Sequence, residues 1–383
     1  MRLSFANKRL QIVLSGFILS YLLLTPYNST FAAKNIPYTE TVDAPQIVDY
    51  PNSMASTGDS ITRGFNTGAT PFTDSPANSW TTGTNASVNT HYLRILSNNP
   101  LINAQVNNDA VTGAIMADLY SQATNVVSQG AQYVTILLGA NDACADTEPE
   151  MTSVSDYRTQ FMAGMNTLST GLPDARIYVL SVPNLYNLWF ILKDNASARF
   201  TWNLLGICQT MLANPLSTAP ADVERRNRVR QRVIDYNTQL AEICASYIHC
   251  RFDNNAAFNI AFVPADVSTR DYFHPTITGQ AKIAEYTYSA GFDFRDGVAP
   301  ASVVTLSQQK GTDGSNTLVT ITARDNVGVS GIEYKINNGP YTRYATPVSL
   351  PAGSNLTYRA VDVNGTIENA RTIMPGFASS GRK

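Results

Sequence analysis

The sequence of 383 residues predicts a three-layer α/β/α sandwich with a parallel sheet, followed by a small all-β domain. From residue 34 to about 295, apolar strand-like runs alternate with helical segments, which is typical of a parallel sheet covered by helices. Beyond Gly297, single apolar residues alternate with polar ones, and Asn-Gly turns separate the runs. We therefore place one domain at residues 45–296 and a β-sandwich module at 299–375.

The first 32 residues have the pattern of a secretory signal peptide. Basic Arg2, Lys8 and Arg9 precede an apolar run over residues 12–24, and small residues close the segment. We expect residues 1–32 to be removed and the protein to be secreted and extracellular. Without them, 24 Lys and Arg residues stand against 29 Asp and Glu residues, a net charge of −5, which argues against a nucleic-acid partner.

Periodicity predicts four elements in the first domain. Residues 133–138 and 176–182 are rich in β-branched and aromatic side chains and predict two strands buried on both faces. Helices are predicted at 113–127 and 156–168.

A longer amphipathic helix is predicted around residues 229–247, because apolar residues recur there at steps of three and four. Its basic face holds Arg225, Arg226, Arg228 and Arg232. Clusters of this kind usually face water, so we predict a solvated face.

Ser60 lies in a Gly-Asp-Ser turn directly after the short apolar run Met54-Ala55, which would hold its hydroxyl out of the sheet. Much later the chain offers Asp271 and His274, and an Asp three residues before a His can orient the imidazole that accepts a serine proton. Taken separately, these are an ordinary turn and a helix-capping carboxylate. Together they predict a serine hydrolase in which Ser60, Asp271 and His274 are catalytic.

Histidine is scarce in this chain, which sharpens the choice of base. The three histidines are His91, His249 and His274. His91 lies in a polar stretch and His249 lies beside Cys250, so we expect both to be structural or solvent-facing. Only His274 has a carboxylate at this spacing.

Asn141 comes just after the predicted strand 133–138, in Gly139-Ala140-Asn141-Asp142. Catalytic groups in open parallel sheets gather beyond the carboxyl ends of the strands. An Asn amide at that place can donate to a developing oxyanion. The alternative is a turn-forming Asn-Asp pair.

These pieces, in this order, resemble the SGNH or GDSL hydrolase superfamily over roughly residues 45–292. The resemblance implies the SGNH hydrolase fold, with Ser60 as nucleophile and Asp271 and His274 as its partners. It also implies an oxyanion hole formed by Ser60, Gly113 and Asn141. Ile61 stands where the family has Leu, a conservative change.

The Ala143-Cys144, Cys208-Gln209 and 235–237 segments look more specifically like secreted bacterial GDSL esterases known as lipases or phospholipases. The expected function is therefore hydrolysis of carboxylic esters, with lipid esters as the first substrate class and no metal or organic cofactor. The Gly-x-Ser-x-Gly motif of α/β-hydrolases is absent, because Thr62 occupies the position where that motif has its second glycine.

Two alternatives stay open. The same site could deacetylate polysaccharides, in which case tryptophans would stack on sugar rings. The chain could instead be a secreted binding or adhesion protein in which the β-module acts and the first domain is inert. The complete set of site residues argues against inertness.

Four cysteines in an exported chain indicate two disulfides, with three possible pairings. Cys244 and Cys250 are close in sequence, so we pair them, which leaves Cys144 with Cys208. A metal site is the alternative, but no pair has CxxC spacing and histidines are few.

The stretch 183–215 is unusually apolar and holds Trp189 and Trp202. It packs either as the underside of a long insertion or as a wall that receives an acyl chain beside the site. The module at 299–375 resembles the immunoglobulin-like modules of secreted bacterial enzymes and is a candidate for contact with a cell wall or polymer. In it, Asp325-Asn326 could indicate calcium, but we interpret the pair as a turn.

Overall fold

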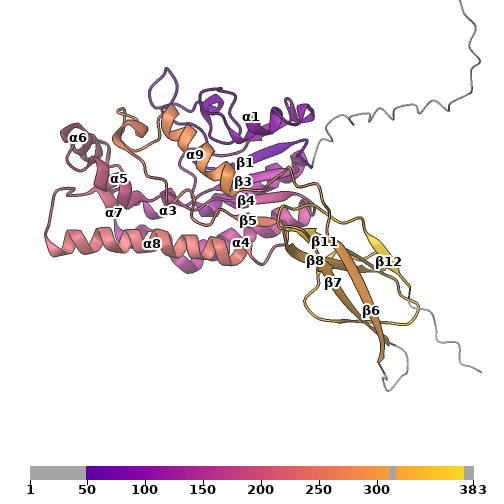
Figure 1. Ribbon diagram of the computed structural model, residues 1–383. Helices are drawn as coiled ribbons and strands as arrows, with labels where there is room; N and C mark the ends of the chain where they lie inside the picture. The colour runs from indigo at the N-terminus through magenta and orange to yellow at the C-terminus, as the bar shows by residue number, and fades with distance from the viewer. Residues whose placement is uncertain (1–48, 310–315, 375–383) are drawn as a thin grey trace, which may run out of the picture. The chain divides into compact units, whose positions relative to one another are not determined.

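The computed structural model describes residues 49–309 and 316–374 (Figure 1). The predicted signal peptide at 1–32 lies outside the described residues and stays a prediction. Among the described residues, no helix is both long and apolar enough to cross a membrane.

A five-stranded parallel sheet forms the centre of the first region, as predicted. Its strand order is β2-β1-β3-β4-β5. In this register Ala55 pairs with Val134, and Val134 pairs with Ile177. The strands are β1 (Met54–Gly58), β2 (Val106–Asn108), β3 (Tyr133–Leu137), β4 (Arg176–Val179) and β5 (Cys250–Phe252).

Helices cover both faces of this sheet. Helices α4 and α8 lie on one side and α1 and α9 on the other (Figure 1). The helices are α1 (His91–Leu96), α2 (Leu119–Gln129), α3 (Ala140–Ala143), α4 (Val154–Gly171), α5 (Leu185–Leu192), α6 (Ala196–Leu205), α7 (Gln209–Leu212), α8 (Pro220–Cys244) and α9 (Ile277–Ala290). The predicted three-layer α/β/α arrangement is confirmed.

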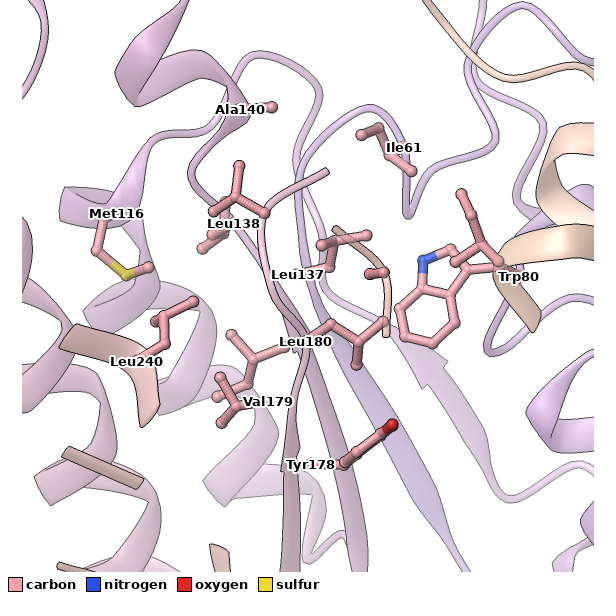
Figure 2. Close-up of a cluster of buried hydrophobic side chains, with 14 of the residues drawn as sticks. Ile61, Trp80, Met116, Leu137, Leu138, Ala140, Tyr178, Val179, Leu180 and Leu240 are labelled. Carbon is pink, nitrogen blue, oxygen red and sulfur yellow. The ribbon is translucent and has the colours of Figure 1, made fainter. Parts of the chain in front are cut away.

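Side chains of the central strands alternate between the two layers, because successive residues of a strand point to opposite faces. Leu137 and Tyr178 point to the side of Trp80, whereas Leu138 and Val179 point the other way, toward Met116 and Leu240 (Figure 2). Both strands β3 and β4 are buried along their whole length. This explains why both read as unbroken apolar runs in the sequence.

The all-β region follows, as predicted, and has its own core. Two antiparallel sheets have the orders β10-β7-β6 and β12-β11-β8-β9. Their strands are β6 (Ala301–Gln309), β7 (Asn316–Arg324), β8 (Val329–Ile336), β9 (Thr342–Arg343), β10 (Val348–Leu350), β11 (Leu356–Asp362) and β12 (Arg371–Ile373). Val319, Leu350 and Leu356 lie at the centre of this core. The immunoglobulin-like identity and the domain boundaries stay predictions.

Charged groups join the all-β region to the first region. The Nε of Arg176 donates to the carbonyl of Asn364 at 2.6 Å. Arg359 of the all-β region donates to Glu333 within its own sheet and also to Asp174 of the first region. The two cores therefore meet through polar contacts whose buried charges have partners.

Both expected disulfides are present. Cys144 is bonded to Cys208, and Cys244 to Cys250. The first ties the segment that follows Asn141 to the apolar insertion 183–215.

Only part of the basic face of α8 is solvated. Arg228 is exposed, whereas Arg226 is buried and Arg225 and Arg232 are half-buried, so the prediction is wrong for these three residues. Arg226 is only 3% exposed, donates to the Ser217 carbonyl at 2.7 Å and lies 4.5 Å from the centre of the Trp189 ring. Arg225 donates to the Thr210 carbonyl. Segment 209–217 folds back over α8, and the carbonyls of its non-helical part need donors.

Candidate active site

Ser60 lies two residues after the end of β1, in a tight turn that begins at Gly58. The backbone conformation and the close neighbours of Gly58 require glycine at that position. Gly58 has a φ of +154°, and a Cβ there would come within 2.8 Å of the Leu137 carbonyl oxygen on the neighbouring strand. The chain then winds up at once, since the amide of Phe65 donates to the Ser60 carbonyl at 3.0 Å. Ser60 is thereby held beyond the carboxyl end of the sheet.

His274 lies between the other two residues predicted to be catalytic. Its Nε2 is 2.8 Å from Ser60 Oγ, and its Nδ1 is 2.7 Å from Asp271 Oδ2. The structure thus brings together three residues that span 214 positions of sequence.

The charge state of Asp271 fixes the proton positions on the imidazole. Burial alone would raise the pKa of Asp271, but the hydrogen bond and charge of His274 and the backbone N–H groups of Phe273 and His274 bring it below its ordinary value. An ionised carboxylate can only accept, so the proton of neutral His274 stays on Nδ1. Nε2 is left to accept from Ser60.

Sequence reasoning missed two supports of this carboxylate and its loop. Asn66 donates from Nδ2 to Asp271 Oδ2, across 205 positions of sequence. The indole N–H of Trp202 in α6 donates to the Tyr272 carbonyl at 2.9 Å, and Tyr272 itself has a φ of +54°. Neither residue belongs to a motif, and no local signal in the sequence marks either one.

Asn141 sits in the first turn of α3, directly beyond β3. Its Nδ2 donates to the Ala114 carbonyl at 2.9 Å. One N–H of the amide therefore fixes the side chain, and the second N–H remains to bind a ligand. This contact places Asn141 against the loop of Gly113, the third residue predicted for the oxyanion hole.

Gly113 lies in a loop and not in the helix predicted over 113–127. Its φ is +85°, which excludes a helical conformation. The carboxylate of Asp118 accepts from the amide of Ile115 at 2.9 Å, so a 3₁₀ turn at Met116–Asp118 precedes α2. The backbone around Gly113 is consequently left outside a helix.

Two buried acids, Asp59 and Asp142, lie next to Ser60 and Asn141 in the sequence. Burial raises the pKa of Asp59 to about 7, against the N–H of Ile61 and the charge of His274, which lower it. Burial likewise raises the pKa of Asp142 to about 6. Asp142 accepts from the amide of Met116 at 2.9 Å and so anchors the loop that carries Gly113.

An apolar pocket borders the site. Ile61, Ala140 and Phe273 line it, and these residues are the sequence neighbours of Ser60, Asn141 and His274. Its charged lining residue, Asp266, is paired with Lys282 at 2.6 Å. The remaining apolar walls come from Pro183, Leu185, Leu188, Val267, Phe262 and Ile283.

The other two histidines are structural, as expected. His91 is fully buried, with Nδ1 3.2 Å from the Tyr133 hydroxyl and Nε2 2.9 Å from Thr287 Oγ1. Burial lowers the pKa of His91 to about 3, so its ring is neutral. His249 is 8% exposed and lies 3.6 Å from Glu333 of the all-β region.

Solved structures resemble this chain only distantly. They include an extracellular lipase from Streptomyces rimosus, at 19% identity and a TM-score of 0.39, with 62% of this chain and 99% of that one covered. An α/β hydrolase from the metagenome of Lake Arreo, Spain, has 17% identity and a TM-score of 0.39, with 62% and 94% covered. An acetyl xylan esterase from Geobacillus stearothermophilus has 13% identity and a TM-score of 0.37, with 62% and 93% covered.

A search of curated proteins finds no significant match. The family model described as GDSL-like lipase/acylhydrolase, however, matches residues 56–287, which is more than half of the chain and begins just before Ser60. The match includes all the residues discussed above as candidate site residues. The chain therefore belongs to the GDSL-like lipase/acylhydrolase family and is a hydrolase of esters.

Proposed function

We propose that this protein is a secreted serine esterase that hydrolyses lipid esters through an acyl-enzyme. The observation that carries the proposal is the position of His274, whose two ring nitrogens are within hydrogen-bonding distance of Ser60 and Asp271. This is the relation between nucleophile, base and orienting acid that activates a serine hydroxyl.

In the first half of the reaction, Ser60 Oγ attacks the ester carbonyl as its proton moves to Nε2 of His274. The negative oxygen of the tetrahedral intermediate accepts from the backbone N–H groups of Ser60 and Gly113 and from the amide of Asn141. His274 then gives its proton to the leaving alcohol, and the C–O bond of the ester breaks. Asp271 stabilises the imidazolium throughout.

In the second half, water attacks the acyl group on Ser60 after losing a proton to His274. The bond between carbonyl carbon and Oγ breaks, and the same proton returns to Ser60. No redox step occurs. His274 accepts the proton from Ser60 or from water in each half and passes it to the leaving group.

Lipid is the preferred substrate class because the pocket is lined mainly by apolar side chains and the insertion that forms part of its wall also exposes apolar side chains. Leu185 and Leu188 of α5 line the pocket. Later in the same insertion, large apolar side chains are exposed, which is typical of binding surfaces. These are Phe190 (59% exposed), Phe200 (69%), Leu204 (65%) and Leu205 (47%).

The tryptophans do not support the polysaccharide alternative. Trp80, Trp189 and Trp202 are 0%, 8% and 1% exposed, so none offers a free ring face to a sugar. Trp189 donates from Nε1 to the Pro215 carbonyl and carries Arg226 over its ring. Of the two interpretations of residues 183–215, packing under the insertion fits Trp189 and Trp202, which are buried. A wall that receives an acyl chain fits Leu185 and Leu188, which line the pocket.

A chain-length series separates the two substrate classes. We expect kcat/KM on soluble p-nitrophenyl esters to exceed release of acetate from acetylated xylan, and to rise from acetate to longer acyl chains. Higher activity on acetylated xylan than on any p-nitrophenyl ester would overturn the lipid assignment while leaving the serine mechanism in place.

The exposed apolar side chains give a second test. Phe200→Ser combined with Leu204→Ser should lower hydrolysis of esters in micelles and leave hydrolysis of a soluble short ester unchanged. Leu101→Ser, at a residue 63% exposed and outside the insertion, is the matched control and should change neither. Equal loss on both substrates would show that α6 acts on the catalytic loop and not on the lipid surface.

Secretion is part of the proposal. The signal-like segment 1–32 and the two disulfides support an oxidising, extracellular location. We assign the all-β region, as an immunoglobulin-like module, to contact with a cell wall or a polymer. Cosedimentation of the full chain with insoluble cell-wall material, compared with a chain ending at Asp296, tests that assignment.

A further inference from the structure

Three carboxylates converge where the chain enters the all-β region. Asp296 lies in the segment after α9, Asp325 in the turn after β7, and Asp362 at the end of β11. One oxygen from each lies within 4.8 Å of the others. Among the described residues, this is the single cluster of its kind, and it shares no residue with the ester-hydrolysing site.

Asp362 is the deepest of the three and is only half satisfied. It is 1% exposed. Its Oδ1 accepts from the amides of Asn364 and Thr366, at 2.7 and 2.8 Å. Its Oδ2 is buried and accepts no hydrogen bond from any described residue. A buried carboxylate oxygen without a partner costs free energy unless a donor or a cation meets it.

Asp325, which follows β7 of the other sheet, also has one bonded and one unbonded oxygen. Its Oδ2 accepts from the amides of Val327 and Gly328, at 2.8 and 3.3 Å, which makes the turn expected from the sequence. Its Oδ1 is buried and has no hydrogen-bond partner among the described residues. The turn therefore uses one oxygen and leaves the other for a ligand.

Asp296 completes the cluster and is held in place by neutral donors. The amide of Asn364 donates to its Oδ2 at 3.0 Å, and the amide N–H of Val298 donates to its Oδ1 at 3.3 Å. In the described parts of the chain, none of the three carboxylates forms an ion pair with Lys, Arg or His. Arg251 is close by, but it donates to the Val363 carbonyl and to Asn364 Oδ1. No described cationic side chain therefore pairs with the cluster.

The chemistry of the cluster fits a hard divalent cation. Calcium takes carboxylate and carbonyl oxygens at about 2.3–2.6 Å, so two ligands on opposite sides of one ion lie up to roughly 5 Å apart. Oxygens within 4.8 Å of one another can therefore all reach a single calcium ion. Magnesium requires about 2.0–2.1 Å and a near-ideal octahedron, and it usually keeps several waters and binds through one or two carboxylates, so a site of three protein carboxylates suits it less well.

Electrostatics point the same way. Burial raises the pKa of Asp362, the hydrogen bonds from Thr366 and Asn364 oppose that rise, and the charge of Asp296 adds to it. Like charges this close repel each other, and a cation between them removes the repulsion.

We propose that Asp296, Asp325 and Asp362 bind one calcium ion. The site fixes the entry segment to two strand ends of the all-β region. Asn364 connects it to the contact between the two cores, because its side chain binds Asp296 and its carbonyl accepts from Arg176. Bound calcium then stabilises the all-β region, and this stabilisation is independent of ester hydrolysis.

The experiment uses the full chain, freed of divalent ions with EGTA and dialysed. Isothermal titration with CaCl₂ should show one site per chain. At a calcium concentration about a hundred times the Kd, the melting temperature should rise by about 4 °C. MgCl₂ at the same concentration should give a clearly smaller rise.

Asp362→Asn and Asp325→Asn each keep an oxygen for the turn amides and remove one charge. Both should weaken calcium binding at least tenfold and lose most of the thermal shift. Asp293→Asn, which makes the same charge change three residues from Asp296 at a carboxylate paired with Arg295, should bind like the wild type. If one of the cluster variants does not fold, the other and the wild-type titration still decide.

The proposal is overturned if the wild-type chain shows neither binding heat nor a thermal shift up to 10 mM CaCl₂. It is also overturned if Asp362→Asn or Asp325→Asn responds to calcium as the wild type does. An equal response to magnesium would overturn the assignment to calcium. Turnover of a soluble ester should be the same with calcium and with EGTA.

Discussion

Asp271 of the α/β region and Asp362 of the all-β region are both buried carboxylates, but their oxygens are bonded in opposite ways. In the α/β region, both oxygens of Asp271 accept hydrogen bonds, from His274, Asn66 and the backbone, and its pKa is lowered. In the all-β region, one oxygen of Asp362 has no donor among the described residues and its pKa is raised. A fully bonded carboxylate can hold a catalytic imidazole. Asp362 keeps an unbonded oxygen, as Asp142 of the α/β region also does, but among the described residues only Asp362 has two further carboxylates beside it.

The difference extends to what each region contributes. All the residues we assign to ester hydrolysis come from the α/β region, and the all-β region meets it through groups such as Arg176 and Glu333. We therefore expect chemistry and stability to be separable by substitutions in the two regions.

The largest effect should follow Ser60→Ala. Loss of the nucleophile is expected to lower kcat on a p-nitrophenyl ester by up to about 10⁶-fold, as for a triad serine elsewhere. The melting temperature should stay near that of the wild type, because the hydroxyl contributes chemistry and little packing. Near wild-type turnover in this variant would exclude Ser60 as nucleophile.

Asn141→Ala should lower kcat by roughly 10²–10³-fold with a smaller change in KM, the size expected for one oxyanion donor. The side chain also holds the Ala114 carbonyl, so a melt of the variant is the control. An effect confined to KM would make Asn141 a residue that positions substrate.

A chain that ends at Asp296 should keep its turnover of soluble esters but melt at a lower temperature. Truncation removes the Asn364 carbonyl from the Nε of Arg176, which keeps its bonds to Asp49, and the loss of one hydrogen bond to a charged group costs about 1.5–3 kcal/mol. Thermal melts and soluble-ester assays of the same preparation check both parts. A cooperative melt without turnover would show that the all-β region completes the active site.

The last prediction concerns the pH dependence of stability that Asp59 introduces. With a pKa of about 7 in the folded chain, compared with 3.8 ordinarily, Asp59 keeps a proton that the unfolded chain releases between about pH 4 and 7. Its contribution to stability is therefore complete below pH 4 and lost as the pH rises to 7.

Asp59→Asn cannot ionise and keeps an oxygen for the amide of Ile61. The melting temperature of the variant relative to wild type should therefore increase as the pH rises from 4 to 7. Melts at intervals of one pH unit measure this. A difference that does not change with pH would mean that Asp59 is ionised throughout.

Local signals predicted the parts of the fold that depend on neighbours in sequence. The strand at 133–138 is observed as β3 and that at 176–182 as β4, each shorter at its end, because an apolar β-branched run carries its own signal. Ser60, Asp271, His274 and Asn141 were found because their motifs are short and contiguous.

The remaining features depend on contacts that no short window of sequence contains. The burial of Arg226 depends on a segment that folds back onto α8. Asn66 reaches Asp271 across 205 positions, and Asp362 meets Asp296 and Asp325 only after the sheets have formed. At Asp325 the turn was predicted, but the free oxygen was not.

The most direct test of the account asks whether Ser60 is the residue that becomes covalently modified. The full chain is treated with a fluorophosphonate, which reacts with activated serines, and the adduct is located by peptide mass. We predict one adduct per chain, on Ser60, with ester turnover falling in parallel and with very slow labelling in His274→Ala. Full loss of turnover with the adduct on a different serine, or continued turnover after Ser60 is labelled, would contradict the account.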